Sequence, residues 1–231
     1  MKKTILALAA LTTGLSASAQ DNASAQALAV TFDATYVSTY VFRGIELAGA
    51  SFQPSVEASY GDFYAGVWYS DDFAGEVSSE ADLYAGYTFA VNETLSADVG
   101  VTRYLYERQD GDATELFAGL KSSLFLSPSL YSYYDLDNQS TSVVAGIGHS
   151  VAIPKLGLSV DLSASCGFVQ QTNGADDYAY WSVGAAVPYK FTEAFKIVGA
   201  VNYSNAGASN PGGRHNEQDQ VVYSLGASFG F

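Results

Sequence analysis

The sequence has one cysteine, Cys166, and its 231 residues contain no apolar run of 18. A single cysteine excludes an intramolecular disulfide, so stability has to come from burial and hydrogen bonding. The missing long apolar run excludes a membrane-spanning helix. If the chain crosses a membrane, it has to do so as strands closed into a barrel.

Basic residues are also scarce. There are 10 Lys and Arg against 24 Asp and Glu, a formal net charge of −14. This acidic balance argues against nucleic acid or an anionic membrane surface as the partner. Charged residues make up 15% of the chain, where soluble domains carry about 25%. The low charge therefore indicates that something apolar covers the outside.

The first residues, "MKKTILALAALTTGLSASAQ", have the features of a secretory signal peptide. Lys2 and Lys3 form a basic start, Ile5 to Leu11 form a short apolar run, and Ala17-Ser18-Ala19 fits the cleavage rule. The apolar run is too short for a membrane anchor, which needs roughly 20 residues. We predict a signal peptide at 1–19 and one mature domain at 20–231.

The mature chain alternates apolar and polar residues over long segments. In "LSVDLSASCGF", for example, Leu158, Val160 and Leu162 share one face, and Ser159 and Asp161 share the other. Alternation over 10 or 11 residues suits a tilted membrane-crossing strand and exceeds the usual soluble strand of about 5–6 residues.

Twelve such segments are predicted, with short and long connections in alternation. They are 28–43, 51–60, 63–70, 80–90, 95–106, 114–122, 129–136, 141–151, 158–169, 178–190, 194–204 and 220–231. This pattern is typical of outer-membrane barrels, in which an even strand count puts both termini in the periplasm. The sequence thus predicts an all-β fold, a single transmembrane antiparallel up-and-down β-barrel of about 12 strands in the outer membrane of a Gram-negative cell.

The polar face distinguishes a membrane barrel from a soluble one. It consists of Ser, Gly, Thr and Asp with almost no lysine, which suits a narrow wet interior better than a solvated exterior. We therefore expect apolar side chains to contact outer-membrane lipids. The chain ends on an aromatic strand with Phe231 last, the kind of end that barrel-insertion machinery recognises.

The stretch "TYVSTYVFRGIE" (35–46) is interpreted as the outer end of the first strand. On this interpretation Tyr40 and Phe42 face lipid in an aromatic girdle. Arg43 points into the lumen mouth, and Gly44 lets the chain turn into the first external loop. Arg103 does not fit the pattern of its strand, because its position puts a charged side chain on the same outward, apolar face as Val99 and Val101. It either reaches toward lipid headgroups or marks a bulge.

Four motifs resemble one known family. "YVSTYVFRGI" (36–45), "GDFYAGVWYS" (61–70), "EADLYAGYTF" (80–89) and "ELFAGL" (115–120) are similar, in this order, to the TorF porin family of Gram-negative bacteria. The segment "IELAGASFQP" (45–54) departs from the Ser-rich version of that family. The resemblance implies an outer-membrane barrel with channel activity, and it carries no ligand site over to this chain.

No catalytic constellation is found. His149 is expected to face outward near a periplasmic turn, and His215 lies in the longest predicted loop. No phosphate-binding loop, zinc-protease motif or Cys/His cluster is present. We therefore predict no enzyme activity, no cofactor and no metal site, and we expect Cys166 to pack outward as a small apolar residue.

The residues at the inward-facing positions of the strands predict an acidic lumen. The candidate pore-lining residues are Asp33, Arg43, Glu57, Trp68, Glu80, Asp82, Tyr84, Asp98, Glu115, Lys121, Asp161 and Lys196. Glu80, Asp82 and Glu115 are expected to cluster at the outer mouth near Arg43. The acids either form a path that favours cations or pair with the bases and stabilise the barrel.

These features predict a porin for passive diffusion of small hydrophilic solutes, with a preference for cations. A backbone diameter of roughly 24 Å leaves a passage of several ångströms. Inward tyrosines such as Tyr64 and Tyr104 would close it if they stacked. The alternatives are a barrel hydrolase acting on lipid or peptide, and a closed barrel for adhesion or envelope structure.

Overall fold

The structure is a computed structural model, and it describes residues 27–107, 111–156, 158–172, 175–206 and 219–231. The predicted signal peptide at 1–19 lies outside these residues. None of the helices in the described part is long and apolar enough to cross a membrane.

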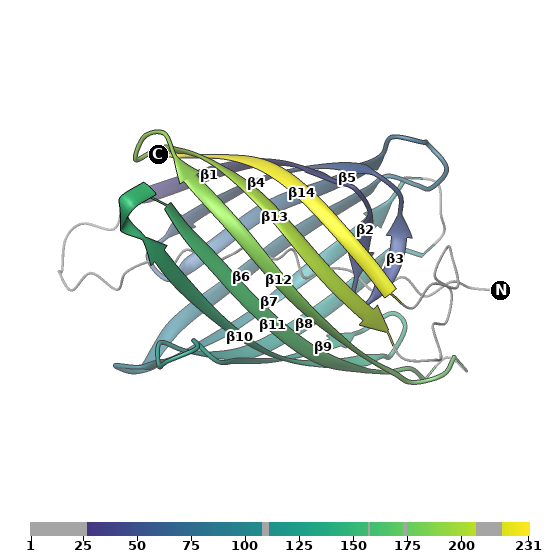
Figure 1. Cartoon of the computed structure of the whole chain (residues 1–231). Helices are drawn as coiled ribbons and strands as arrows, with labels where there is room; N and C mark the ends of the chain where they lie inside the picture. The colour runs from purple at the N-terminus through teal and green to yellow at the C-terminus, as the bar shows by residue number, and fades with distance from the viewer. Residues whose placement is uncertain (1–26, 108–110, 157, 173–174, 207–218) are drawn as a thin grey trace.

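Twelve long strands form a closed antiparallel barrel (Figure 1). They are β1 (Leu28–Val37), β4 (Ser51–Tyr60), β5 (Phe63–Asp72), β6 (Glu80–Asn92), β7 (Leu95–Tyr106), β8 (Ala113–Ser122), β9 (Ser129–Asp135), β10 (Thr141–Ile153), β11 (Leu158–Gln170), β12 (Tyr178–Lys190), β13 (Phe195–Ala206) and β14 (Asp219–Gly230). Sequential strands pair from β4 to β14, and β1 closes the ring by pairing with both β14 and β4. The predicted fold class and strand number are confirmed.

Apolar side chains face outward along every strand. On β14, Val221, Tyr223 and Leu225 are 47%, 61% and 60% exposed, whereas Gln220 and Ser228 are buried. The same alternation on β8 exposes Leu116 and Leu120 and buries Glu115. The predicted orientation, with an apolar outside and a polar inside, is confirmed.

The glycines of the inner face make room for aromatic rings. At five positions a ring from the neighbouring strand lies so close over a glycine that an added Cβ would collide with it. The pairs are Tyr84 over Gly66, Tyr64 over Gly86, Phe117 over Gly100, Tyr131 over Gly119 and Tyr180 over Gly167. These rings therefore lie along the wall and do not stack across the lumen.

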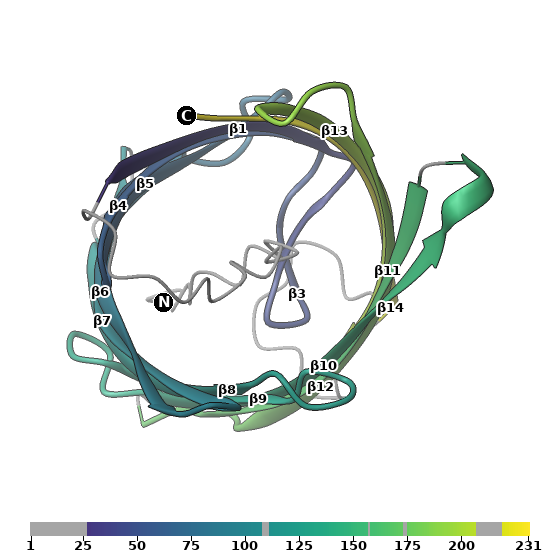
Figure 2. The same ribbon diagram turned by 90° about the vertical axis from the view of Figure 1, so that its left-hand side faces the viewer.

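The first predicted strand is wrong beyond Val37. β1 ends there, and β2 (Tyr40–Phe42) and β3 (Ile45–Ala48) form a separate two-stranded sheet. In Figure 2, which looks along the barrel, this hairpin lies inside the ring of strands. Tyr40 and Phe42, expected in a lipid-facing girdle, are only 7% and 3% exposed.

The turn explains why the chain leaves the wall. Arg43 and Gly44 have positive φ angles of 46° and 80°, as in a two-residue turn that joins tightly paired strands. A Cβ on Gly44 would lie 2.7 Å from the Tyr180 Cβ. Both the backbone conformation and the close approach to β12 therefore require glycine at this position.

The other strand boundaries agree with the predictions to within about two residues. Arg103 does not sit at a bulge, because its pairing with Leu83 and Thr114 continues in unbroken register. Its guanidinium donates to the Thr114 hydroxyl at 2.7 Å and lies 3.3 Å from the Asp112 carboxylate and 3.5 Å from that of Asp137. The positive charge of this outward arginine is thus balanced by the nearby Asp112 and Asp137 carboxylates.

Candidate functional site

The candidate site is the barrel interior and the segment folded into it. We call residues 40–48 the lumen hairpin. The barrel end to which it attaches is the hairpin end, and the end at which Leu28 and Phe231 lie is the terminal end. The hairpin comes from between β1 and β4, and its tip reaches strands on the far side of the ring.

Arg43 fixes the tip of the lumen hairpin. Its guanidinium donates two hydrogen bonds to the Glu115 carboxylate on β8, at 2.9 and 3.0 Å, and one to the Ser142 hydroxyl on β10 at 2.9 Å. Its central carbon lies 4.5 Å from the centre of the Tyr133 ring. Arg43 and Glu115 are 4% and 1% exposed, so water does not compete with this two-pronged ion pair.

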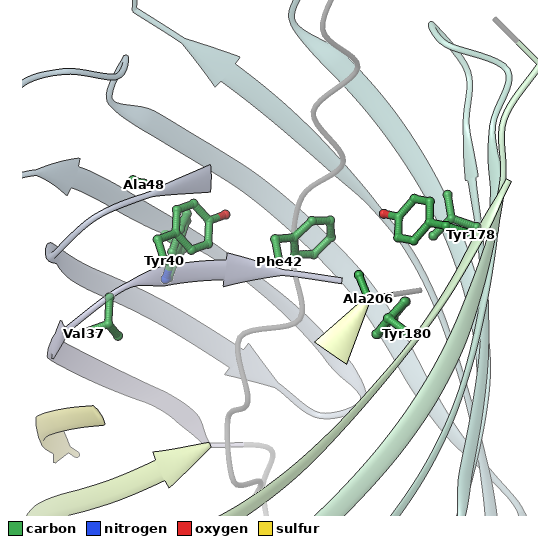
Figure 3. Close-up of a cluster of buried hydrophobic side chains, with 9 residues drawn as sticks. Val37, Tyr40, Phe42, Ala48, Tyr178, Tyr180 and Ala206 are labelled. Atoms are coloured by element: carbon green, nitrogen blue, oxygen red, sulfur yellow. The ribbon is translucent and has the colours of Figure 1, made fainter. Parts of the chain in front are cut away.

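Apolar packing holds the body of the hairpin. Val37, Tyr40, Phe42 and Ala48 belong to one cluster with Trp68 on β5 and with side chains of β11 to β13. In Figure 3, Tyr40 and Phe42 extend from the hairpin, and Tyr178 and Tyr180 face them from the opposite wall. The rings of Tyr40 and Trp68 are 5.5 Å apart. The hairpin therefore bridges two walls of the barrel.

An acidic cluster lies under the hairpin. The Glu80 carboxylate accepts hydrogen bonds from the Tyr40 and Tyr106 hydroxyls at 3.1 and 3.0 Å. Glu115 accepts a further bond from the Tyr104 hydroxyl at 2.9 Å. Asp82 is 0% exposed, and neither of its carboxylate oxygens has a hydrogen-bond partner among the described residues. Of the three acids predicted to group near Arg43, Glu80 and Asp82 lie on β6, and Glu115 lies on β8, where it binds Arg43.

A second carboxylate organises the wall toward the terminal end. Asp98 accepts hydrogen bonds from the hydroxyls of Tyr64 at 2.9 Å, Tyr131 at 2.7 Å and Thr88 at 3.3 Å. The Lys121 ammonium is 3.6 Å away. Glu57 accepts a bond from the Tyr84 hydroxyl at 3.0 Å. These acids hold the tyrosine hydroxyls against the wall.

The predicted pore-lining residues in the strands share the inward parity of their strands, opposite to the outward apolar side chains. Trp68, Glu80, Asp82, Asp98 and Glu115 are buried there. The less buried side chains are Asp33, Glu57, Tyr84, Lys121, Asp161 and Lys196. The structure adds Lys190, which pairs with Lys196 on the same face.

Sequence reasoning missed several residues that fix the hairpin. Ser142, Tyr104 and Tyr133 contact the Arg43–Glu115 pair but have no motif of their own. The hairpin itself had a signal, because a dipeptide ending in glycine, Arg43-Gly44, separates two short apolar runs. The unbroken alternation through Phe42 hid that signal.

The geometry offers little for catalysis. The His149 ring faces outward, 5.3 Å from the Phe125 ring, and His215 lies outside the described residues. Among the described residues, no group of three or more His, Cys, Asp or Glu side chains is placed to hold a metal ion. Cys166 is a free, exposed cysteine on β11.

A family model covers most of the chain. Residues 20–229 match the family described as "Bacterial protein of unknown function (Gcw_chp)", and the chain belongs to this family. No curated protein matches the sequence.

The fold is similar to that of solved channels. The KdgM porin shares 11% identity with this chain at a TM-score of 0.60, covering 88% of this chain and 99% of the porin. The NanC porin shares 9% at a TM-score of 0.59, covering 87% and 98%. An outer-membrane channel from Pseudomonas putida F1 shares 12% at 0.54, covering 92% and 100%. At such identities the comparison establishes the barrel fold alone.

Proposed function

We propose that this protein is an outer-membrane channel through which small hydrophilic solutes diffuse passively, and that the lumen hairpin forms its constriction. The observation that carries the proposal is the combination of an apolar outside with an inside of carboxylates, hydroxyls and glycines. Such a barrel is stable in lipid because every wall strand is paired and no edge remains. The similarity in fold to the KdgM and NanC porins supports the same function.

Because the hairpin lies in the lumen, solutes would pass beside it. The hairpin tip is held by Arg43, and its body packs on the walls, so the hairpin takes up part of the cross-section there. The constriction would therefore set the size limit, and it points to small solutes and not folded chains.

We further propose a preference for cations. Asp33, Glu57 and Asp161 face the lumen without being fully buried, and among the described residues Asp33 and Glu57 form no ion pair with a basic side chain. A narrow passage lined by one sign of charge raises the local concentration of the opposite sign. Glu115 contributes little to the negative potential in the lumen, because Arg43 neutralises its charge.

The compartment and orientation belong to the same proposal. An exported chain with the signal peptide 1–19 would insert with Phe231 recognised by the barrel-insertion machinery, the terminal end in the periplasm and the hairpin end outside. The resemblance of "YVSTYVFRGI" and three further motifs to the TorF porin family supports this assignment.

Ion conduction in a planar lipid bilayer tests the proposal. Purified mature protein is expected to give discrete current steps in potassium chloride. Under a salt gradient, the reversal potential should have the sign of cation preference. No current steps would contradict the channel, and a reversal potential of anion sign would contradict the charge preference alone.

A closed barrel is the second candidate, because the hairpin is held in the lumen by both packing and a buried ion pair. On this alternative the protein has a structural or adhesive role. It predicts that the wild-type protein does not conduct while a variant without the hairpin does.

A further inference from the structure

Four inward aromatic rings form a feature that the channel proposal does not use. We call Tyr64, Tyr84, Phe117 and Tyr131 the aromatic wall. They lie on β5, β6, β8 and β9, and all four are partly exposed. Tyr64, Phe117 and Tyr131 lie closer to the terminal end than the Arg43–Glu115 pair does. Tyr84 lies level with Glu115, because both residues pair with Thr102 on β7.

The rings lie over the wall of the barrel. Each covers the backbone of a glycine on the next strand, namely Gly86, Gly66, Gly100 and Gly119. The rings therefore fill the space that glycine leaves and add apolar aromatic surface to the inner side of the barrel. The hydroxyls of Tyr64 and Tyr131 are bound to Asp98, and that of Tyr84 to Glu57. The three tyrosine rings are therefore held in place before any solute arrives.

The opposite side of the barrel has a different chemistry. In the strand order of the ring, β5 to β8 lie across from β11 to β14. Several inward positions there carry small polar groups, including Ser165 and Ser182, whose hydroxyls are 2.8 Å apart. Others carry Tyr180, Lys190 and Lys196. The Asn202 carbonyl oxygen is buried and has no hydrogen-bond partner among the described residues. This side offers hydrogen-bonding groups where the other offers flat apolar faces.

We propose that this part of the lumen binds uncharged saccharides, with a sugar ring stacked on the aromatic wall and its hydroxyls directed to the serine and asparagine side. This rests on the proposed channel function and names its solute class. A pyranose has a face of C–H groups, which carry partial positive charge and suit the negative face of an aromatic ring. Its edge carries hydroxyls, which need partners when they leave water.

Charge decides between classes of saccharide. Asp98 and Glu57 lie at the edges of the aromatic wall, and Lys121 is the basic group next to Asp98. An acidic sugar would bring its carboxylates close to these acids, so an uncharged sugar is favoured. This distinguishes the chain from the KdgM porin, one structure of which was determined in complex with disordered oligogalacturonate.

Calorimetric titration of the purified full-length mature barrel tests the proposal. The detergent should be a zwitterionic one without a sugar headgroup, and the probes are maltohexaose and hexagalacturonate. Wild-type protein is expected to bind maltohexaose and to bind hexagalacturonate at least tenfold more weakly. Phe117→Leu, which still covers Gly100 but has no ring face, should weaken maltohexaose binding by about tenfold.

Two variants separate the ring face from other effects. Tyr134→Leu removes an outward ring from the same strand as Tyr131, so it should leave maltohexaose binding unchanged. Leu116→Ala, on the outward face beside Phe117, should leave binding unchanged. The change in gel mobility on heating shows that each variant is folded.

The outcomes separate this inference from the channel proposal. A barrel that conducts ions but does not bind maltohexaose would overturn the saccharide site and leave the channel intact. Binding that is unchanged in Phe117→Leu, or equally strong for hexagalacturonate, would also overturn it. A barrel that binds maltohexaose but never conducts would overturn the channel and keep the site.

Discussion

Arg43 and Arg103 show how burial changes the contribution of an ion pair. Arg43 and Glu115 have side chains 1% and 2% exposed, whereas Arg103 and Asp112 are each 40% exposed. Removal of one partner from a buried pair leaves an uncompensated charge, which costs about 3–5 kcal/mol. An exposed pair contributes about 0–1 kcal/mol. The two arginines thus provide a matched comparison within one molecule.

Arg43→Ala is expected to lower the free energy of unfolding by about 3 kcal/mol, because Glu115 then stays buried without its cation. Arg103→Ala should lower it by less than about 1 kcal/mol. Urea unfolding in lipid vesicles, followed by tryptophan fluorescence, measures both. Arg43→Ala/Glu115→Gln should recover part of the loss. Equal effects of the two single variants would show that the hairpin is not seated by Arg43.

Asp82 and Asp135 are both buried aspartates with opposite surroundings. Asp82 lacks hydrogen-bond partners among the described residues, whereas Asp135 accepts bonds from the Asp137 and Asn138 amides and from the Asn138 side chain. Asp82→Asn is expected to stabilise the barrel by about 1 kcal/mol or more, since a buried carboxyl group without hydrogen-bond partners costs more to take out of water than a neutral amide. Asp135→Asn should destabilise it by a similar amount. The same unfolding assay shows whether each variant is more or less stable than the wild-type protein. A destabilised Asp82→Asn would indicate that the barrel needs the Asp82 carboxyl group.

At the scale of elements, the pairing of an aromatic ring with a glycine recurs across the wall. Adding a Cβ at Gly86 would displace the Tyr64 ring, whereas Gly199 has nothing within 4 Å of such an atom. Gly86→Ala is expected to cost about 1–3 kcal/mol, and Gly199→Ala should be neutral or slightly stabilising. Thermal unfolding followed by gel mobility compares them. An insensitive Gly86 would mean that the ring can move from the wall without loss.

Most elements were predictable from the sequence because the alternation is strict. Segments such as Leu158–Gln170 expose one face to an apolar surrounding and the other to polar groups, so their parity and length follow directly. The lumen hairpin was not predictable in this way. Its alternation continues that of β1, and only contacts distant in sequence, such as Arg43 with Glu115, draw it inside.

The candidate site was predictable to the same extent. Parity identified which acids face inward, including Glu80, Asp82 and Glu115. It did not reveal that Arg43 neutralises Glu115 or that three hydroxyls converge on Asp98. Such pairings depend on register between strands, which a single sequence does not specify.

At the scale of the whole molecule, the accessible acids should set the ion preference. Asp33→Asn, Glu57→Gln and Asp161→Asn together are expected to lower the cation-to-anion permeability ratio by roughly threefold or more. Asp137→Asn, in the turn between β9 and β10 beside Arg103, should leave it unchanged. Reversal potentials under a salt gradient measure both. An unaltered ratio in the triple variant would contradict the proposed role of the lumen acids.

The central claim is that a wet lumen, narrowed by the folded-in hairpin, runs through an apolar-coated barrel. Deletion of 40–48 tests it, since the Tyr40 amide lies 3.2 Å from the Gly49 carbonyl oxygen and the cut ends can be joined without moving the wall. The most direct measurement is the single-channel conductance of this deletion beside that of the wild-type protein. We expect both to conduct, the deletion with steps about twofold larger or more, because conductance rises with cross-section. Absence of current in both, with folded protein present, would contradict the account.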